Sequence, residues 1–292
     1  MHRLRIVLKW GLYVVLSLPL CYGLWLSFRA LVGYYFTIPT GSMLPTLQMG
    51  DKVFVNKLLM GARIYTDLHF DKDGGDLKAF RLCGLRDLER GDIVVFNFPE
   101  HNGKVSFVIN NVYCKRVIAL PGDSISAENG FYRNNNYSGT LGVDEVQRQF
   151  SQIPDSLLPK EILNFYPYDE HIPWTTKNFG PLYVPRKGDI MRITPREGLL
   201  YRLQLEWELD ADIASDWDNN VVTANGKPLL RHQFKHDYLF LAGDNVADSN
   251  DSRYWSFVPK DYVVGIVSHV LFSRDDEADT MRWNRTLKNV EQ

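Results

Sequence analysis

An uncharged run near the N-terminus is the feature that most constrains how this chain of 292 residues can fold. Residues 10–28 carry no charged side chain. A helix of about 19 residues is about 28 Å long, which is close to the thickness of a bilayer's hydrocarbon core, about 30 Å. The run therefore predicts a transmembrane anchor at residues 10–29, with a short tail at 1–9 before it and the rest of the chain beyond it.

The charges beside this run predict its orientation. Arg3, Arg5 and Lys9 precede it, whereas Arg29 alone follows closely. Basic residues favour the cytoplasmic side, so we expect a cytoplasmic N-terminus and a chain that continues on the opposite side of the membrane. No later segment reaches about 18 apolar residues, which predicts a single-pass protein. A cleavable signal peptide is the alternative, but residues 26–32 fit a small-x-small cleavage site poorly.

Composition favours β structure and argues against binding to nucleic acid. Aromatic residues make up 13% of the chain, and Val, Ile, Tyr and Phe recur in short runs, as they do in strands. The net charge is −2 with both signs interspersed, which gives no basic face for nucleic acid. The three cysteines, Cys21, Cys83 and Cys114, fit no zinc-site spacing. A disulfide between Cys83 and Cys114 remains possible.

Runs that alternate or are continuously apolar predict the strands of a mainly β core. These runs lie at residues 51–57, 93–98, 105–109, 112–120, 238–242 and 262–272. We expect the core in two parts, 30–125 and 236–275.

The segment between the two parts has a different character. Residues 126–235 contain many prolines and few long apolar runs, which indicates an inserted β-rich subdomain. Within it, alternation predicts a strand at 201–209, and residues 146–165 indicate an irregular, partly helical piece. After the core, residues 276–292 form a polar C-terminal tail that we expect to be flexible.

A rigid turn presents a serine directly after the uncharged run. In residues 38–47, Ser42 lies between Pro39 and Pro45, with Gly41 just before it. Proline fixes φ and glycine permits unusual backbone angles, so the hydroxyl is held in one place. A serine becomes a nucleophile only with a base beside it.

Lys115 is the best candidate for that base. The chain has no G-x-S-x-G motif, and three histidines are more typical of surface or structural positions, namely His171, His232 and His236. Lys115 lies in a strand-like run between Cys114 and apolar residues, where a dry core would lower its pKa. A shift from about 10.4 to about 8 requires about 3 kcal/mol. Alternatively, Lys115 reaches solvent or pairs with Asp123 or Asp244.

Groups for an oxyanion and for an apolar groove lie near the serine. The Ser42 backbone N–H and the Thr40 hydroxyl are candidate oxyanion donors. The aromatic cluster 34–36 is typical of a membrane interface, and it could also wall a groove that leads to Ser42.

Four motifs in a fixed order make the chain resemble bacterial type I signal peptidase, a membrane Ser–Lys endopeptidase. They are PTGSMLPTL at 39–47 followed by GD at 50–51, RGDIVVF at 90–96, KRVIALPGD at 115–123, and GDN at 243–245 with DSRYW at 251–255. The motifs cover about 45–50 residues and leave the middle region nearly unmatched. The resemblance implies an all-β signal-peptidase core after an N-terminal transmembrane helix.

The resemblance also implies a role for each matching position. Ser42 is similar to the family's nucleophile and Lys115 to its general base, with Thr40 in the oxyanion-hole position. Ser249 lies where the family has a hydroxyl that orients the lysine. The remaining matches are a structural ion pair, Asp251 and Arg253, and positions that line pockets for small substrate side chains, namely Phe36, Ile38, Pro39 and Met43.

The chain departs from the family pattern at two places. Val246 and Ala247 stand where the family has Arg and Asp, which affects charge pairing in the last motif. The separation of about 73 residues between Ser42 and Lys115 implies an insertion near 62–88.

The function that the resemblance implies is removal of signal peptides from exported preproteins. Small residues at substrate positions −1 and −3 would enter shallow apolar pockets. Membrane lipid would be a further partner, whereas no nucleic acid, metal or cofactor would be required. The enzyme would lie in the bacterial inner membrane, with its catalytic domain on the extracytoplasmic side.

Two other functions are compatible with parts of the sequence. An inactive anchored homologue could act as an adaptor or chaperone, but Thr40, Ser42, Lys115 and Ser249 are all present. A self-cleaving Ser–Lys regulator of the repressor type shares the dyad, but it carries a DNA-binding domain where this chain has its uncharged run.

Overall fold

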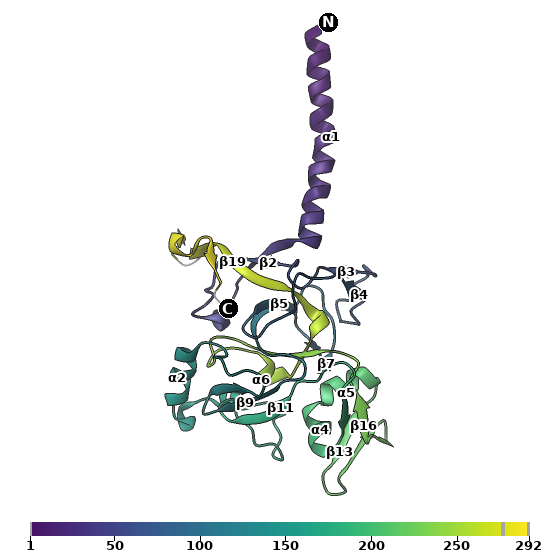
Figure 1. Cartoon of the computed structure of the whole chain (residues 1–292), viewed down its shortest axis with the longest axis vertical. Coiled ribbons are helices and arrows are strands. Elements are labelled where there is room, and N and C mark those ends of the chain that lie inside the picture. Colours follow the sequence, from purple (N-terminus) through teal and green to yellow (C-terminus); the bar gives the residue numbers. More distant parts are fainter. Residues whose placement is uncertain (1, 276–277, 291–292) are drawn as a thin grey trace.

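The computed structural model describes residues 2–275 and 278–290. A long N-terminal helix stands away from a β-rich body, as Figure 1 shows. The helices of the described chain are α1 (His2–Leu31), α2 (Asp144–Gln152), α3 (Lys160–Leu163), α4 (Pro195–Leu200), α5 (Arg202–Leu209) and α6 (Ser252–Trp255).

Strands are the predominant regular structure of the body, which confirms the prediction of a mainly β fold. Those before the middle region are β1 (Gly33–Thr37), β2 (Asp51–Asn56), β3 (Arg63–Tyr65), β4 (Ala79–Arg81), β5 (Ile93–Asn97), β6 (Glu100–His101), β7 (Lys104–Val105) and β8 (Val112–Ala119). Those of the middle region are β9 (Ser124–Glu128), β10 (Phe131–Asn134), β11 (Phe179–Tyr183), β12 (Ile190–Arg192), β13 (Ile213–Asp216), β14 (Val221–Ala224), β15 (Lys227–Pro228) and β16 (Arg231–Gln233). The last are β17 (Tyr238–Ala242), β18 (Val258–Pro259), β19 (Val263–Asp275), β20 (Thr280–Met281) and β21 (Lys288–Asn289).

A nine-stranded antiparallel sheet forms the centre of the described body. Its order is β1-β2-β19-β5-β8-β17-β18, with β20 and β21 also paired to β19. Strands β5 and β17 are buried along their whole length, as their continuous apolar runs predict. Successive side chains of β5 alternate between two cores: Ile93 and Val95 face one, and Val94 and Phe96 face the other.

Most of the strands predicted for the core are present. The runs at 51–57, 93–98, 112–120, 238–242 and 262–272 correspond to β2, β5, β8, β17 and β19. The predicted strand at 105–109 is largely wrong. Only β7 and one isolated bridge at Phe107 form there.

The middle region, from β9 to β16, packs against strand β17 of the central sheet. It contains three small sheets, β10-β9-β11, β12-β16 and β13-β14-β15, and helices α2 to α5. Phe240 of β17 stacks on Phe165 and Phe179, so an aromatic core joins the middle region to the central sheet. The partly helical piece predicted near 146–165 is confirmed by α2 and α3.

The strand predicted at 201–209 is wrong, because these residues form α5. The leucines at odd positions alternate as in a strand, but Arg, Gln, Glu and Leu are strong helix formers. Leu203, Gln204, Leu205 and Glu208 are buried, which is a helical spacing. A capping box between Thr194 and Glu197 starts the preceding helix α4.

The C-terminal segment was expected to be flexible, and this expectation is wrong for its described part. Strands β20 and β21 pair with β19. Arg285 is buried and donates two hydrogen bonds to the Asp51 carboxylate, at 3.0 and 2.5 Å. Charged side chains in a terminal segment suggested solvent contact, but here one of them neutralises a buried carboxylate.

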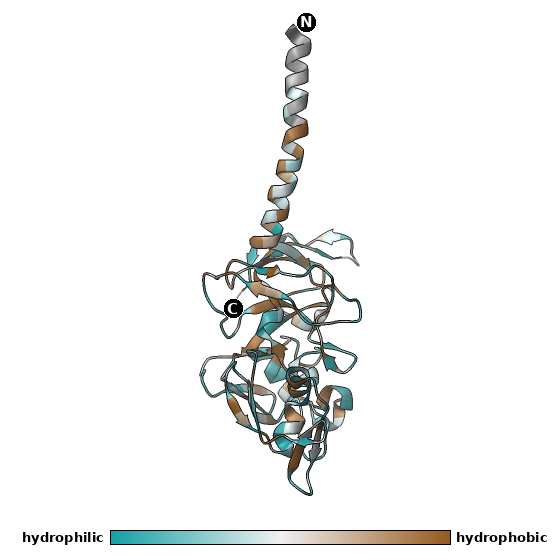
Figure 2. Ribbon diagram, turned by 90° about the vertical axis from the view of Figure 1, so that its right-hand side faces the viewer, coloured by the Kyte–Doolittle hydropathy of each residue, from teal (hydrophilic) through white to brown (hydrophobic). Residues whose placement is uncertain are grey.

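Helix α1 contains the uncharged run of the sequence. Figure 2 shows hydrophobic residues along its described part. Among the residues that the structure describes, no helix combines the length and apolar character needed to cross a membrane.

Candidate active site

The Ser42 turn packs on the central sheet. A 3₁₀ turn at Gly41–Met43 follows β1, and Met43 and Leu47 are buried in the same core as Ile93 and Val95 of β5. The turn is also held from the other side. Asn245 donates from its backbone N–H to the Ser42 carbonyl at 3.1 Å, and its side chain donates to the Gly41 carbonyl at 3.2 Å.

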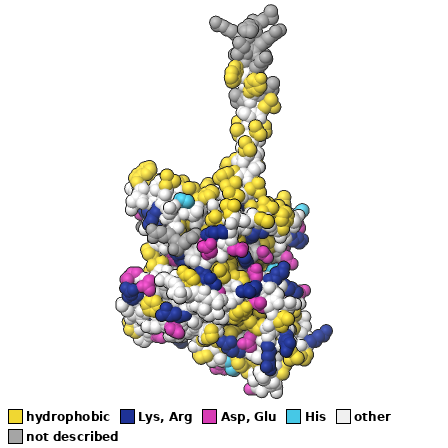
Figure 3. Space-filling model, viewed as in Figure 1, with side chains coloured by type: hydrophobic (Ala, Val, Ile, Leu, Met, Phe, Trp, Pro, Cys, Tyr) yellow, Lys and Arg dark blue, Asp and Glu magenta, His cyan; other side chains and the backbone are white. Residues whose placement is uncertain are grey.

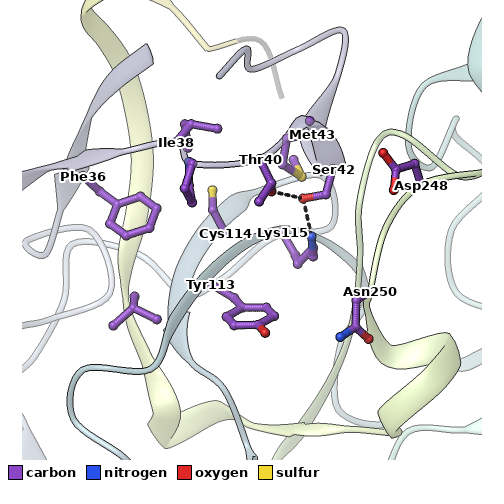
Figure 4. Close-up of a pocket in the computed structure, with 13 residues that line it drawn as sticks. Phe36, Ile38, Thr40, Ser42, Met43, Tyr113, Cys114, Lys115, Asp248 and Asn250 are labelled. Carbon is purple, nitrogen blue, oxygen red and sulfur yellow. Dashed lines mark hydrogen bonds between the residues drawn. The ribbon is translucent and has the colours of Figure 1, made fainter. Parts of the chain in front are cut away.

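Lys115 of β8 extends to the Ser42 hydroxyl. The distance from Lys115 Nζ to Ser42 Oγ is 2.5 Å, and Figure 4 shows the two side chains pointing toward each other. Lys115 is 3% exposed, and this burial lowers its pKa, whereas the nearby charge of Asp251 raises it in part. The amine is therefore neutral at a lower pH than a free lysine would be.

The alternative partners of Lys115 are occupied by arginines. Arg90 forms a bidentate ion pair with Asp123 at 2.8 and 2.6 Å. Arg116 does the same with Asp244 at 2.6 and 2.7 Å. Both carboxylates are thus neutralised without Lys115.

Thr40 lies on the exposed side of the same turn. Its hydroxyl donates to Ser42 Oγ at 3.4 Å, and Figure 4 draws this contact beside that of Lys115. The structure therefore brings three predicted site residues, Thr40, Ser42 and Lys115, to one point.

Asp251 and Arg253 form a fully buried ion pair behind the site. Both are 0% exposed, and Arg253 donates twice to the carboxylate, at 2.8 Å each. The carboxylate also accepts the Gly243 N–H at 2.9 Å, and Arg253 donates to the Val246 carbonyl at 2.8 Å. The pair therefore fixes both ends of the loop after β17. Val246, which departs from the family pattern, is itself buried and takes part through its backbone.

Ser249 is buried near the dyad but makes no hydrogen bond to Lys115. Its Oγ is without a partner among the described residues. A Cβ at Gly243 would lie 2.2 Å from Ser249 Oγ and 2.4 Å from the Ser42 carbonyl oxygen. Only glycine lets these two segments approach so closely.

A pocket of about 340 Å³ opens beside Ser42 and Lys115. Every substrate-binding residue predicted from the sequence lines it, namely Phe36, Ile38, Pro39 and Met43. Sequence reasoning missed five other lining residues, which are Val112, Tyr113, Cys114, Asp248 and Asn250. Their positions in the sequence could have indicated them, because they directly precede Lys115 or flank Ser249.

Cys114 contributes a buried thiol to this pocket. Burial raises the pKa of Cys114 to about 12, so the thiol stays protonated. Cys83 is exposed and unpaired, and Cys114 is free as well. The disulfide that the sequence left open is therefore absent.

One edge of β8 is open beside the pocket. Strand β5 pairs with residues 112–116 on one side, and β17 pairs with residues 116–119 on the other. Within the described chain, no strand covers residues 112–115 on the β17 side.

The candidate histidines lie elsewhere. His232 is buried with its ring nitrogen 2.7 Å from Glu208, and His171 stacks on Trp217. Across residues 2–275 and 278–290, no group of three or more His, Cys, Asp or Glu side chains could hold a metal ion.

Comparison with known proteins gives several matches. A family model described as signal peptidase, peptidase S26, matches residues 7–272. A signal peptidase I of Rickettsia massiliae is 36% identical over 267 residues, covering 91% of this chain and 79% of the relative. One of Buchnera aphidicola from Acyrthosiphon pisum is 29% identical over 252 residues, covering 85% and 70%.

The matched regions do not span the full relatives or structures. Some relatives are covered to 59% of their length and others to 85%. A crystal structure of a signal peptidase I from Enterococcus faecalis matches 62% of this chain and 96% of that chain, at 19% identity and a TM-score of 0.29.

Proposed function

The chain belongs to the signal peptidase family, peptidase S26, and is an enzyme that hydrolyses peptide bonds; we propose that it removes signal peptides from exported preproteins with a Ser42–Lys115 dyad. The observation that carries this proposal is the 2.5 Å contact between Ser42 Oγ and the Nζ of Lys115, a buried residue. No other lysine or histidine contacts Ser42 among the described residues.

The geometry supports a two-step acyl transfer. Neutral Lys115 takes the Ser42 proton as the hydroxyl oxygen attacks the carbonyl carbon before the cleaved bond. The resulting ammonium then gives that proton to the leaving amine. Lys115, neutral again, deprotonates a water that attacks the acyl carbon. It then returns this proton to Ser42 Oγ as the ester bond breaks and the carboxylate product leaves.

Charge on the carbonyl oxygen needs donors during both steps. The Ser42 backbone N–H and the Thr40 hydroxyl are the proposed donors. The Thr40 hydroxyl already lies 3.4 Å from Ser42 Oγ, so it needs only to rotate from the nucleophile to the oxyanion.

The open edge of β8 is the proposed docking place for the substrate. An extended signal-peptide segment would pair with residues 112–115 and so extend the sheet next to Lys115. The apolar side chains of Ile38, Met43 and Cys114 line the pocket beside this edge and would form shallow subsites there. Small residues at substrate positions −1 and −3 fit such a space better than large ones.

We further propose that α1 anchors the enzyme, with residues 10–29 in the bacterial inner membrane, the N-terminus in the cytoplasm and the catalytic domain on the other side. The absence of charge from 10 to 28 and the bias of basic residues before it support this topology. Apolar side chains are exposed from Val15 to Leu31. Figure 3 shows that hydrophobic side chains also cover the body next to the foot of α1. Tethering enzyme and substrate to one membrane raises their effective concentration.

The proposal is tested by incubating the purified full chain, in nonionic detergent, with a preprotein that has Ala at −1 and −3. We expect one cut, directly after the −1 residue, identified by intact mass and N-terminal sequencing. A matched substrate with Leu at −1 should remain uncut, because the shallow subsite proposed for that position would not hold a large side chain. Binding without any product would instead support an adaptor, and cleavage of the enzyme alone would support a self-cleaving regulator.

Thr40→Val is expected to lower kcat about 10²-fold with little change in KM, since it removes a donor that acts mainly in the transition state. Thr40→Ser keeps the hydroxyl and serves as the matched control. Steady-state kinetics on the same preprotein measure both. An unchanged kcat in Thr40→Val would exclude Thr40 from the oxyanion hole.

A further inference from the structure

A second pocket, of about 460 Å³, lies where α1 meets the β body. Three basic residues from different elements line it: Arg29 in the last turn of α1, Lys57 just after β2, and Arg63 at the start of β3. Figure 3 shows the hydrophobic surface at the foot of the helix, the level at which this pocket lies. Val112 lines both this pocket and the one beside Ser42, so the two are neighbours.

None of the three cations has a carboxylate partner within the described residues. The Arg29 guanidinium lies over the Trp25 ring at 4.8 Å. Lys57 Nζ donates to two carbonyl oxygens at the end of α1, those of Arg29 at 2.7 Å and Ala30 at 3.4 Å. These acceptors are neutral, so the charges of Arg29 and Lys57 remain uncompensated.

Arg63 is the most deeply placed of the three. It is 8% exposed, and all its acceptors are neutral: the carbonyls of Asp261 and Tyr262, the Tyr65 hydroxyl and the Asn97 side-chain oxygen. Its Nε is buried and has no hydrogen-bond partner. A buried donor without an acceptor is unfavourable, and an unpaired buried charge more so.

The three charges also affect one another. Burial, together with the positive charges of Arg63 and Arg29, lowers the pKa of Lys57 to about 8. A bound anion would relieve this repulsion and could accept hydrogen bonds from Lys57 and Arg29.

We propose that this pocket binds the phosphate of an anionic phospholipid headgroup. The proposal rests in part on the anchoring role proposed for α1, which sets the pocket at headgroup depth. A phosphate offers several acceptor oxygens, which suits donors that converge from three elements. Apolar residues of the same pocket, Leu26, Ala30 and Val264, would contact the start of the acyl chains. Bound lipid would thus lie next to the substrate groove.

The test is native mass spectrometry of the full chain in nonionic detergent, with phosphatidylglycerol or phosphatidylcholine added at equal concentration. We expect one phosphatidylglycerol to be retained, and retention to fall at least about tenfold in the double variant Arg29→Gln/Lys57→Gln. Arg192→Gln, an exposed arginine on β12, is the matched control and should retain the lipid fully. Thermal unfolding in lipid-free detergent checks that the variants are folded. Arg63→Lys is a second, independent variant, and we expect it to retain phosphatidylglycerol more weakly than the wild-type chain.

Two results would overturn the proposal. One is the absence of an expected difference in retention. This would be equal retention of the two lipids by the wild-type chain, or equal retention of phosphatidylglycerol by the wild-type chain and the double variant. The other is displacement of the lipid by inorganic phosphate at similar concentration, which would make free phosphate the ligand. Cleavage of a preprotein is measured in the same samples, and its absence would contradict the proposed function without changing the result on lipid retention.

Discussion

Ser42→Ala is expected to reduce kcat/KM for preprotein cleavage by at least about 10³-fold, the loss typical of removing a serine nucleophile. Among the described residues, no other hydroxyl is hydrogen-bonded to Lys115, and Thr40 approaches Ser42 from the exposed side. The loss should appear almost entirely in kcat. Product formation, followed by intact mass over hours, measures it.

Lys115 variants test the base separately from the nucleophile. Lys115→Met should lose as much activity as Ser42→Ala, and the double variant should lose little more, because the two residues act as one unit. Lys115→Arg should be equally inactive, since a guanidinium stays protonated and cannot accept a proton. Lys177→Met is a matched control, because Lys177 is also buried but contacts Ile153 and Asp155, away from the site. Full cleavage by Lys115→Arg would eliminate Lys115 as the base.

The pH dependence follows from the same lysine. Burial lowers the pKa of Lys115 below its ordinary value of 10.5, and only the neutral amine can take the Ser42 proton. We therefore expect kcat/KM to rise with pH and to level off below pH 10.5. A profile that still rises at that pH would show that the active base has an ordinary lysine pKa.

The largest effect on stability is expected from Asp251→Asn. Burial raises the pKa of Asp251, but the charge of Arg253 and its hydrogen bonds outweigh this and keep the pKa below its usual range. The variant would leave a 0% exposed guanidinium without its counter-charge, which costs about 3–5 kcal/mol of unfolding free energy. Denaturant unfolding measures the loss. Activity should fall as well, because Asp251 also holds the Gly243 N–H beside the dyad.

Two further variants separate this effect from a general loss of charge. Asp144→Asn breaks an exposed pair with Arg148 and should cost less than about 1 kcal/mol. Asp251→Leu combined with Arg253→Met removes both buried charges, and we expect it to be more stable than Asp251→Asn. If the double variant were the less stable of the two, unpaired charge would not be the cause.

The sequence predicted the central sheet and the segments of the site well, because both depend on local patterns. Continuous apolar runs located β5, β8 and β17, and the two prolines around Ser42 indicated a fixed turn. The contact between Ser42 and Lys115 required more than pattern. It depends on how β8 lies in the sheet relative to the turn, a register that only the folded chain defines.

The errors have a common physical origin in competing local signals. At 201–209 strict alternation competed with strong helix propensity, and packing within the middle region favoured a helix. Near the C-terminus, the polar composition favoured a flexible tail. It gave no indication that Arg285 pairs with Asp51, which lies far away in the sequence. Asp248 and Asn250 were missed because a pocket wall leaves no periodic pattern in a loop.

The contact between Arg285 and the segment after Ser42 has a consequence for the order of events during synthesis. Arg285 donates to the Thr46 carbonyl at 2.9 Å as well as to Asp51, and so supports the chain just beyond the nucleophile. Arg285 follows Ser42 far along the chain, so the nucleophile is synthesised long before this support. A ribosome-bound chain that has already exposed Ser42 therefore still lacks the contacts that hold it in place. The segment that carries the nucleophile is therefore fully supported only after Arg285 has been synthesised and has folded back onto it.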